Sequence, residues 1–288
     1  MSHPTSDEPY EVVIEPNRGW VRIDWKALWE YRDLLLLFVR REFLSKYKQT
    51  ILGPAWFVIN PLLTTIVFSV VFGQMAQIPT DGIPPILFYL CGLLGWNYFS
   101  QVVSTGSAVF HSHGPLFSKV YFPRLTLPLS VVVSTLCAFA LQFVTFLGFY
   151  VYYKLFVPAA FGLSPSWHLV FLPLLIIQVG ALSLGVTLWM SAVTAKYRDL
   201  IHINQFIMQL WMYGTPIIYP LSRVPPKWTW LVWSNPMCSV VESFRLCLLG
   251  RGTISVTHLV TSLLSTLIIL YSGVLIYQKT ERTVADIA

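Results

Sequence analysis

The chain has 288 residues, of which 55% are hydrophobic and only 11% are charged. A soluble domain carries about 25% charged residues and a disordered chain has few aromatics, whereas 15% of these residues are aromatic. The composition therefore excludes both classes and predicts an all-α integral membrane protein. The four cysteines form no C-x-x-C pair, so neither a disulfide scaffold nor a metal site is expected.

The region before the first apolar stretch divides into two parts. Residues 1–19 offer little to pack and are expected to be a flexible cytoplasmic tail. Residues 20–54 are expected to form an amphipathic interface helix, because apolar residues recur at helical spacing between charged ones, followed by a Leu-Gly-Pro turn that begins at Leu52. Arg40 and Arg41 would then lie at the inner leaflet. There they either anchor lipid headgroups or recognise a phosphate on a lipid substrate.

Residues 55–280 are expected to form a transmembrane domain of six helices. Long stretches of this region contain no Asp, Glu, Lys or Arg, as a membrane-spanning helix of about 20 residues requires. The predicted spans are 56–78, 84–109, 125–153, 168–194, 202–220 and 256–278. Residues 281–288 would form a short cytoplasmic tail.

The distribution of Lys and Arg predicts the orientation of these spans. With both termini in the cytoplasm, the outer side holds only a minority of the 19 basic residues, namely Lys154, Arg223, Lys227, Arg245 and Arg251. The positive-inside rule favours this orientation over its reverse. The net charge of +6 is then explained by topology and by attraction to anionic lipids, and no nucleic-acid partner is expected.

Aromatic residues lie near the middle of two predicted spans. Trp96 and Tyr98 are in the second span, and Trp211 and Tyr213 are in the fifth. Indole N–H and phenol O–H groups need hydrogen-bond partners when they are buried, so these residues should face protein or water rather than lipid. They either pack between helices or line an aqueous pathway in which their rings could contact sugars.

The outer segment between the last two spans, residues 221–255, is too short and interrupted for a further span. It contains three tryptophans, several prolines, and the pair Glu242 and Arg245 at i, i+3 spacing. We expect a re-entrant or interfacial helical hairpin that lines a path, because re-entrant backbone is tolerated only where protein or water surrounds it.

The sequence offers little for catalysis. Between residues 55 and 278 the carboxylates are limited to Asp81, Asp199 and Glu242, all outside the predicted spans. No P-loop and no G-x-S-x-G motif occurs, so a nucleotide site is not expected in this chain. A membrane-embedded enzyme acting on lipid-linked sugars would need catalytic groups facing one side. A secondary transporter would normally show intramembrane ionisable groups.

Four motifs in chain order resemble the membrane subunit of ABC-type polysaccharide exporters, the family of O-antigen, capsule and teichoic-acid permeases. They are RDLLLLFVRREFLSKYKQTILGPAWFVINP at 32–61, KVYFPRLTLP at 119–128, YRD at 197–199 with GTPIIYP at 214–220, and NP at 235–236 with ESFR at 242–245 and Gly250. The family usually has Ser-Pro where this chain has Thr215-Pro216. The resemblance covers about residues 20–285.

The resemblance implies an N-terminal interface helix, six spans, short cytoplasmic coupling segments and outer gate helices between spans five and six. It also implies a homodimer in the bacterial inner membrane, paired with two copies of a separate P-loop ATPase that would bind ATP and Mg²⁺. The substrate would be a polysaccharide attached to a polyprenyl pyrophosphate, with O-antigen as the first choice and capsule or teichoic acid as alternatives.

Together with the aromatic pattern, the resemblance assigns roles to residues of this chain. The lipid-pyrophosphate end of the substrate would enter at Arg40, Arg41, Lys48, Leu52 and Gly53. The channel would be lined by Trp56, Trp96, Tyr98, Trp211, Tyr213 and Tyr219. The ATPase would contact Phe117, Lys119, Tyr197, Arg198 and Asp199, in the inner segments 110–122 and 195–201. The outer gate, within 221–250, would include Trp228, Trp230, Glu242 and Arg245.

Overall fold

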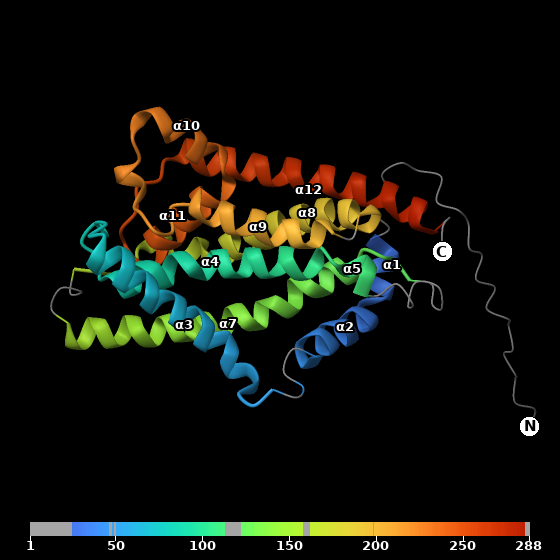
Figure 1. Cartoon of the computed structure of the whole chain (residues 1–288), viewed down its shortest axis with the longest axis horizontal. Helices are drawn as coiled ribbons and strands as arrows, with labels where there is room; N and C mark the ends of the chain where they lie inside the picture. The colour runs from blue at the N-terminus through green and yellow to red at the C-terminus, as the bar shows by residue number, and fades with distance from the viewer. Residues whose placement is uncertain are drawn as a thin grey trace, which may run out of the picture.

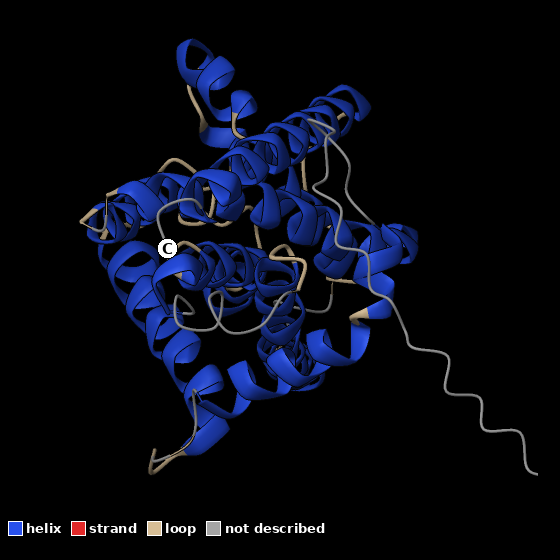
Figure 2. Ribbon diagram, turned by 90° about the vertical axis from the view of Figure 1, so that its right-hand side faces the viewer, coloured by secondary structure: helices blue, strands red, loops and turns tan. Residues whose placement is uncertain are grey.

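The computed structural model describes residues 25–45, 48, 50–112, 122–157, 162–197 and 199–285, which form helices joined by short loops. No strand occurs among these residues, as Figure 2 shows. The predicted tail 1–19 lies outside them. Helices satisfy their own backbone hydrogen bonds, which is what a lipid environment requires of a spanning segment.

Five of the six predicted spans are helices long and apolar enough to cross a membrane, within the part of the chain that the structure describes. They run Gly53–Met75, Pro85–Gly106, Thr126–Phe156, Trp167–Lys196 and Val256–Glu281. The elements concerned are η1 (Gly53–Ala55), α3 (Trp56–Phe68) and η2 (Ser69–Met75), then α4 (Pro85–Gly106), α7 (Thr126–Phe156), η4 (Trp167–Phe171) with α8 (Leu172–Lys196), and α12 (Val256–Ala285). The predicted boundaries agree with these helices to within a few residues.

The remaining predicted span, 202–220, is only partly helical. Helix α9 covers Leu200–Tyr213, and its 14 residues are about 21 Å long, short of the ~30 Å hydrocarbon core. The helix ends because Pro216 has no backbone N–H to continue it. The Thr215 backbone N–H donates to the Met212 carbonyl at 3.1 Å, and the Thr215 hydroxyl replaces it at the Trp211 carbonyl, at 2.8 Å. The residues after Tyr213 form turns, so the count of six spans stays a prediction.

The predicted interface helix is divided in two. Helix α1 covers Trp25–Glu30 and α2 covers Arg32–Ser45. One face of α2 packs against α7, and the buried Phe38 ring lies 5.6 Å from the Phe122 ring just before α7. The opposite face of α2 is exposed and mixes leucines with arginines. Such a face suits a helix whose apolar side chains enter the lipid while its charged groups reach water.

The turn after α2 depends on Gly53. Its φ of +52° lies in the left-handed region, where a side chain costs about 1–2 kcal/mol. No other atom lies within 4 Å of a Cβ built at this position, so conformation rather than space selects glycine. Pro54 follows in η1 and leads the chain into α3. Leu52, Gly53 and Pro54 thus lie in the connection that leads from α2 into α3.

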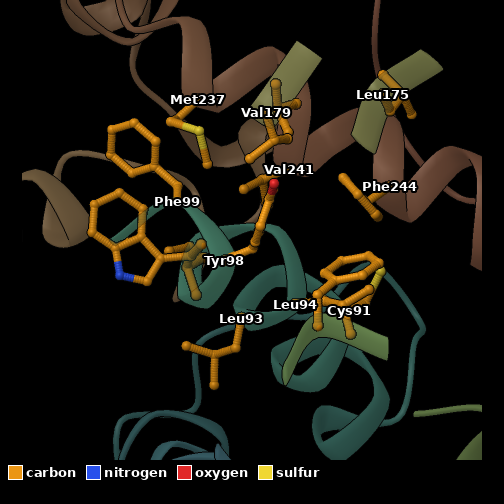
Figure 3. Close-up of a cluster of buried hydrophobic side chains, with 14 of the residues drawn as sticks. Cys91, Leu93, Leu94, Tyr98, Phe99, Leu175, Val179, Met237, Val241 and Phe244 are labelled. Carbon is orange, nitrogen blue, oxygen red and sulfur yellow. The ribbon is translucent and has the colours of Figure 1, made fainter. Parts of the chain in front are cut away.

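Helix α4 forms the centre of the bundle. It contacts α3, α7, α8, α9 and α11 (Pro236–Leu249). Its side chains supply much of the main hydrophobic core, in which Tyr98 and Phe99 lie near Val179 of α8 and Val241 of α11 (Figure 3). A Cβ at Gly95 of α4 would lie only 3.3 Å from the ring of Phe244 on α11. Glycine on this helix therefore allows α11 to approach closely.

Helices α8 and α12 pack against each other most extensively of the described pairs. A Cβ on Gly185 would lie 2.8 Å from the Leu270 Cα, and a Cβ on Gly273 would lie 2.6 Å from the Gly185 carbonyl oxygen. Backbone therefore meets backbone at this crossing. Small residues give membrane helices this close contact, which replaces the hydrophobic driving force that lipid cannot supply.

The bundle has two distinct ends (Figure 1). Helices α10 (Pro226–Ser234) and α11 lie at one end, and α5 (Val109–Ser112) lies at the other with the last turns of α12. At the α5 end, Arg124 forms an ion pair with Glu281 at 3.7 Å. The Tyr277 hydroxyl also donates to the Arg124 carbonyl at 3.2 Å. These contacts join the start of α7 to the end of α12.

The backbone contact between α8 and α12 predicts that Gly185→Ala destabilises the protein by about 1–3 kcal/mol, because the added methyl group meets backbone atoms that cannot rotate away. The matched control is Gly148→Ala in α7, where no atom lies within 4 Å of the new Cβ. That change should be neutral or stabilise the helix by up to about 1 kcal/mol. Thermal unfolding of both variants in detergent measures the difference. Equal midpoints for the two variants would contradict the packing argument.

Candidate functional site

A helical hairpin formed by α10 and α11 connects α9 to α12, where the sequence predicts short helices. Helix α10 is largely exposed and presents Trp228 and Trp230, whereas α11 is buried against α4, α8 and α12. The side-chain oxygen of Asn235 accepts the Met237 backbone N–H at 3.0 Å, so Asn235 caps the start of α11. Gly250, with a φ of +66°, ends the helix. The two predicted pairs of gate residues therefore lie in different environments.

Glu242 and Arg245 form an ion pair on the buried helix α11, where they are 4% and 1% exposed. The Arg245 Nη1 donates to the Glu242 Oε2 at 3.2 Å. The Arg245 Nη2 donates to the Ile217 carbonyl at 3.0 Å, and the Glu242 Oε1 accepts the Thr253 backbone N–H at 2.9 Å. Ile217 precedes the hairpin and Thr253 follows it. The ion pair thus ties α11 to both connecting loops.

Helix α4 provides the surface on which Arg245 lies. The guanidinium carbon is 3.7 Å from the centroid of the Phe88 ring, a cation–π contact. Gly92 provides the space for the guanidinium, since a Cβ at this position would lie 3.1 Å from the Arg245 Nη2. Burial lowers the pKa of the Arg245 guanidinium, and the neighbouring Glu242 carboxylate opposes that shift. The carboxylate and the ring together compensate for part of the lost hydration.

Asn235 holds the hairpin to α9. The Trp211 Nε1 donates to the Asn235 Oδ1 at 2.9 Å, and the Asn235 Nδ2 donates to the Thr215 Oγ1 at 3.0 Å. The Trp211 ring also meets the Phe99 ring of α4 edge-on, with centroids 5.1 Å apart. One amide therefore joins the end of α9, the turn after it and the start of α11. In the sequence Asn235 stands out only as part of the Asn-Pro motif, which does not indicate these contacts.

An open pocket of about 850 Å³ lies between the hairpin and the end of α9. Two of the predicted channel residues, Trp211 and Tyr219, line it, together with the predicted gate residue Trp228. The other wall residues come from the turns around Pro225, from α10 and α11, and from Ile269 of α12. The structure thus brings together residues that the sequence had assigned to two separate roles.

The other aromatic residues predicted to line a channel are divided between core and surface. Trp96 and Tyr98 are both 3% exposed, and the Tyr98 hydroxyl donates to the Val132 carbonyl of α7 at 3.3 Å. These two residues therefore pack between helices, which was one of the two interpretations of the sequence. Neither lines an open surface in this structure. Trp56 and Tyr213, by contrast, are 42% and 48% exposed.

The predicted phosphate-binding residues lie around the turn between α2 and α3. Arg40 and Arg41 are exposed on α2, and Lys48 and Leu52 are exposed after it. Gly53 supplies the left-handed turn. Three exposed cations therefore lie close together in sequence where the chain leaves α2, and such cations are suited to binding a phosphate.

Of the predicted ATPase contacts, Tyr197 and Asp199 are exposed in the connection between α8 and α9. Phe117, Lys119 and Arg198 lie outside the described residues. Close to this connection, the Asn204 Nδ2 of α9 donates to the Ser107 hydroxyl after α4 at 3.0 Å. This contact was not expected from the sequence, because Asn204 shares α9 with the polar residues His202, Gln205 and Gln209 and nothing local distinguishes it from them.

A profile of the ABC-2 type transporter family matches residues 33–249 of the chain. Relatives include the O-antigen export system permease protein RfbA of Myxococcus xanthus, 32% identical over 223 residues, or 76% of this chain and 82% of that protein. The RfbA of Klebsiella pneumoniae is 28% identical over 258 residues, or 88% of this chain and 95% of that protein. The polysialic acid transport protein KpsM of Escherichia coli is 22% identical over 246 residues, or 84% of this chain and 91% of that protein.

The buried ion pair predicts strong non-additivity between its two partners. Glu242→Leu should cost about 3–5 kcal/mol of stability, because Arg245 would remain buried without its counter-charge. The double variant Glu242→Leu with Arg245→Met should cost much less than the sum of the single changes, since no uncompensated charge remains. Thermal unfolding in detergent of the wild type, the two single variants and the double variant completes this double-mutant cycle and measures the coupling between the two side chains.

The control for the ion-pair cycle is Arg251→Met, which removes an exposed cation two residues after α11 and should change stability by less than about 0.5 kcal/mol. Additive costs for Glu242→Leu and Arg245→Met would show that the two side chains do not stabilise each other.

Proposed function

Because the chain belongs to the ABC-2 type transporter family, we propose that it is the permease subunit of an ATP-driven exporter of a lipid-linked polysaccharide across the bacterial inner membrane. The observation that carries this proposal is the similarity to O-antigen export permeases along most of the chain, up to 88% of it. O-antigen is the first candidate substrate because those relatives are 32% and 28% identical, against 22% for KpsM. Capsular polysaccharide is the second candidate, supported by KpsM.

The energy would come from a separate subunit. The chain has no P-loop sequence, so ATP and Mg²⁺ would bind two copies of a partner ATPase attached to a homodimer of this chain. The partner would contact the exposed Tyr197 and Asp199 at the α5 end, with the inner segments 110–122 and 195–201. This end would be cytoplasmic and would include both termini, leaving the α10–α11 hairpin outside.

The substrate would follow a path between two copies of the chain. Its pyrophosphate end would bind Arg40, Arg41 and Lys48 at the inner leaflet, where the exposed face of α2 meets the Gly53 turn. Trp56 and Tyr213 are exposed and could present their ring faces to passing sugars. Trp96 and Tyr98 would instead hold α4 in the core.

The hairpin would close the outer end of this path. Helix α11 is fixed to both connecting loops by the Glu242–Arg245 pair, so a displacement of α9 or α12 would be transmitted to it. The exposed tryptophans of α10 would form the mobile edge of the gate. Movement of the coupling segments by the ATPase would thereby open the path at the far end of the bundle.

The first test of the proposed function is purification of the tagged chain from its native membranes in mild detergent, with mass spectrometry of the proteins that accompany it. We expect a P-loop ATPase in a one-to-one ratio with this chain. A chain that purifies alone in several detergents, with no P-loop protein enriched, would overturn the exporter assignment.

The second test concerns the substrate's phosphate. The double variant Arg40→Ala with Arg41→Ala should reduce surface polysaccharide by about tenfold or more at normal protein level, because charge-assisted contacts to phosphate contribute about 1.5–3 kcal/mol each. Lys26→Ala, which removes an exposed cation from α1, is the control and should export normally. Immunoblots of surface polysaccharide against membrane protein provide the measurement. Normal export by the double variant would exclude this role for the two arginines.

A further inference from the structure

The pocket at the α10 end has walls of aromatic and aliphatic side chains. They include Trp211 of α9, Tyr219 of the following turn, Trp228 and Leu231 of α10, and Ile269 of α12. A volume of about 850 Å³ is within the range of small-molecule sites. The lining residues therefore reach from the exposed helix α10 to the middle of α12, which is one of the helices apolar enough to cross a membrane.

The Trp211 indole, the Asn235 amide and the Ser234 hydroxyl in these walls are already paired within the protein. The Trp211 Nε1 and both side-chain heteroatoms of Asn235 are hydrogen-bonded to each other or to Thr215. The Ser234 hydroxyl donates to the Trp230 carbonyl at 2.8 Å. A sugar in this pocket would bury hydroxyl groups without partners, which is costly. A hydrocarbon would meet no such penalty, so the walls favour a lipid over a saccharide.

Arg223 is the single charged residue among those that line the pocket. It is exposed, and no carboxylate lies among the lining residues. The carboxylate on the adjacent loop, Asp81, accepts hydrogen bonds of 2.9 and 3.1 Å from Ser222. The guanidinium is thus placed beside an apolar volume, and the anion that best matches its fork of donors is a carboxylate or a phosphate.

We propose that this pocket binds a lipid that carries a phosphate, with the phosphate on Arg223 and the first part of the hydrocarbon between Trp211, Trp228 and Ile269. The same chemistry is offered by a polyprenyl phosphate carrier and by an anionic phospholipid. The proposal rests on the membrane location of the chain, and on the proposed function only in placing the pocket at the outer leaflet. Lipid binding can be measured without export, so the failure of one does not imply the failure of the other.

The experiment uses the full chain with its co-purifying partners in nanodiscs of phosphatidylcholine. The discs contain added undecaprenyl phosphate, added phosphatidylglycerol, or neither, and native mass spectrometry measures the lipid retained by the protein after release. We expect one of the two anionic lipids to be retained, and Arg223→Gln to reduce its retention at least about tenfold. The matched control is Lys227→Gln, four residues on, where an exposed cation that does not line the pocket is neutralised. It should retain lipid as the wild type does.

A second variant tests the pocket independently of the charge. Val224 lines the pocket outside the spans, so Val224→Trp should fill part of the volume and displace the lipid while Arg223 stays in place. Retention of undecaprenyl phosphate would identify the carrier as the ligand, and retention of phosphatidylglycerol would identify a bulk lipid. Either result supports the proposal if Arg223→Gln and Val224→Trp each reduce that retention at least about tenfold. Retention at the wild-type level by either variant, or no retention by the wild type, would overturn it.

Discussion

The rest of the structure depends on the burial of one apolar helix, α4, on all of its sides. In its most apolar window 78% of the residues are buried, against 17% for the span that precedes it. Lipid is as apolar as a leucine side chain, so burial alone does not hold helices together in a membrane, and close packing has to do so. The glycines of α4 provide that packing, because Gly92 and Gly95 admit Arg245 and Phe244 of α11 to van der Waals distance. The position of the α10–α11 hairpin therefore follows from the surface of α4.

A buried ion pair adds little to the stability of a protein, but it can fix the positions of the segments that it contacts. Removing two charges from water costs several kcal/mol each, and their mutual attraction offsets this only when the remaining hydrogen bonds are also made. Here Glu242 and Arg245 each use a second atom to bind a backbone group in a different loop. A hydrophobic pair could fill the same space but could not fix Ile217 and Thr253 in register. The pair suits a helix that has to move together with the segments on both sides of it.

Hydropathy predicts the spans well, because the absence of charge is a local property that a membrane requires of each segment separately. Predictions from the sequence were less accurate for features that depend on residues far away in the chain. Pro216 ends α9 earlier than the charge-free stretch suggested. Trp96 and Tyr213 look equivalent in the sequence, yet one is buried and the other exposed. Since apolar residues occur on every face of the first half of α4, its pattern does not reveal which face meets which neighbour. The pairing of Arg245 with Ile217 likewise depends on chain folding that local spacing does not encode.

The two lipid-phosphate sites that we propose differ in a way that suits one-way transport. At the inner turn, the three cations Arg40, Arg41 and Lys48 are all exposed within nine residues of chain. At the outer pocket, a single guanidinium stands beside a large apolar volume. A phosphate exposed to water is attracted less strongly by one cation than by three, so the outer site would hold the headgroup more weakly. A lipid whose phosphate is held weakly and whose hydrocarbon already lies among aromatic side chains can leave sideways into the outer leaflet. Release would then need no further input from the ATPase, which would act only on the steps before it.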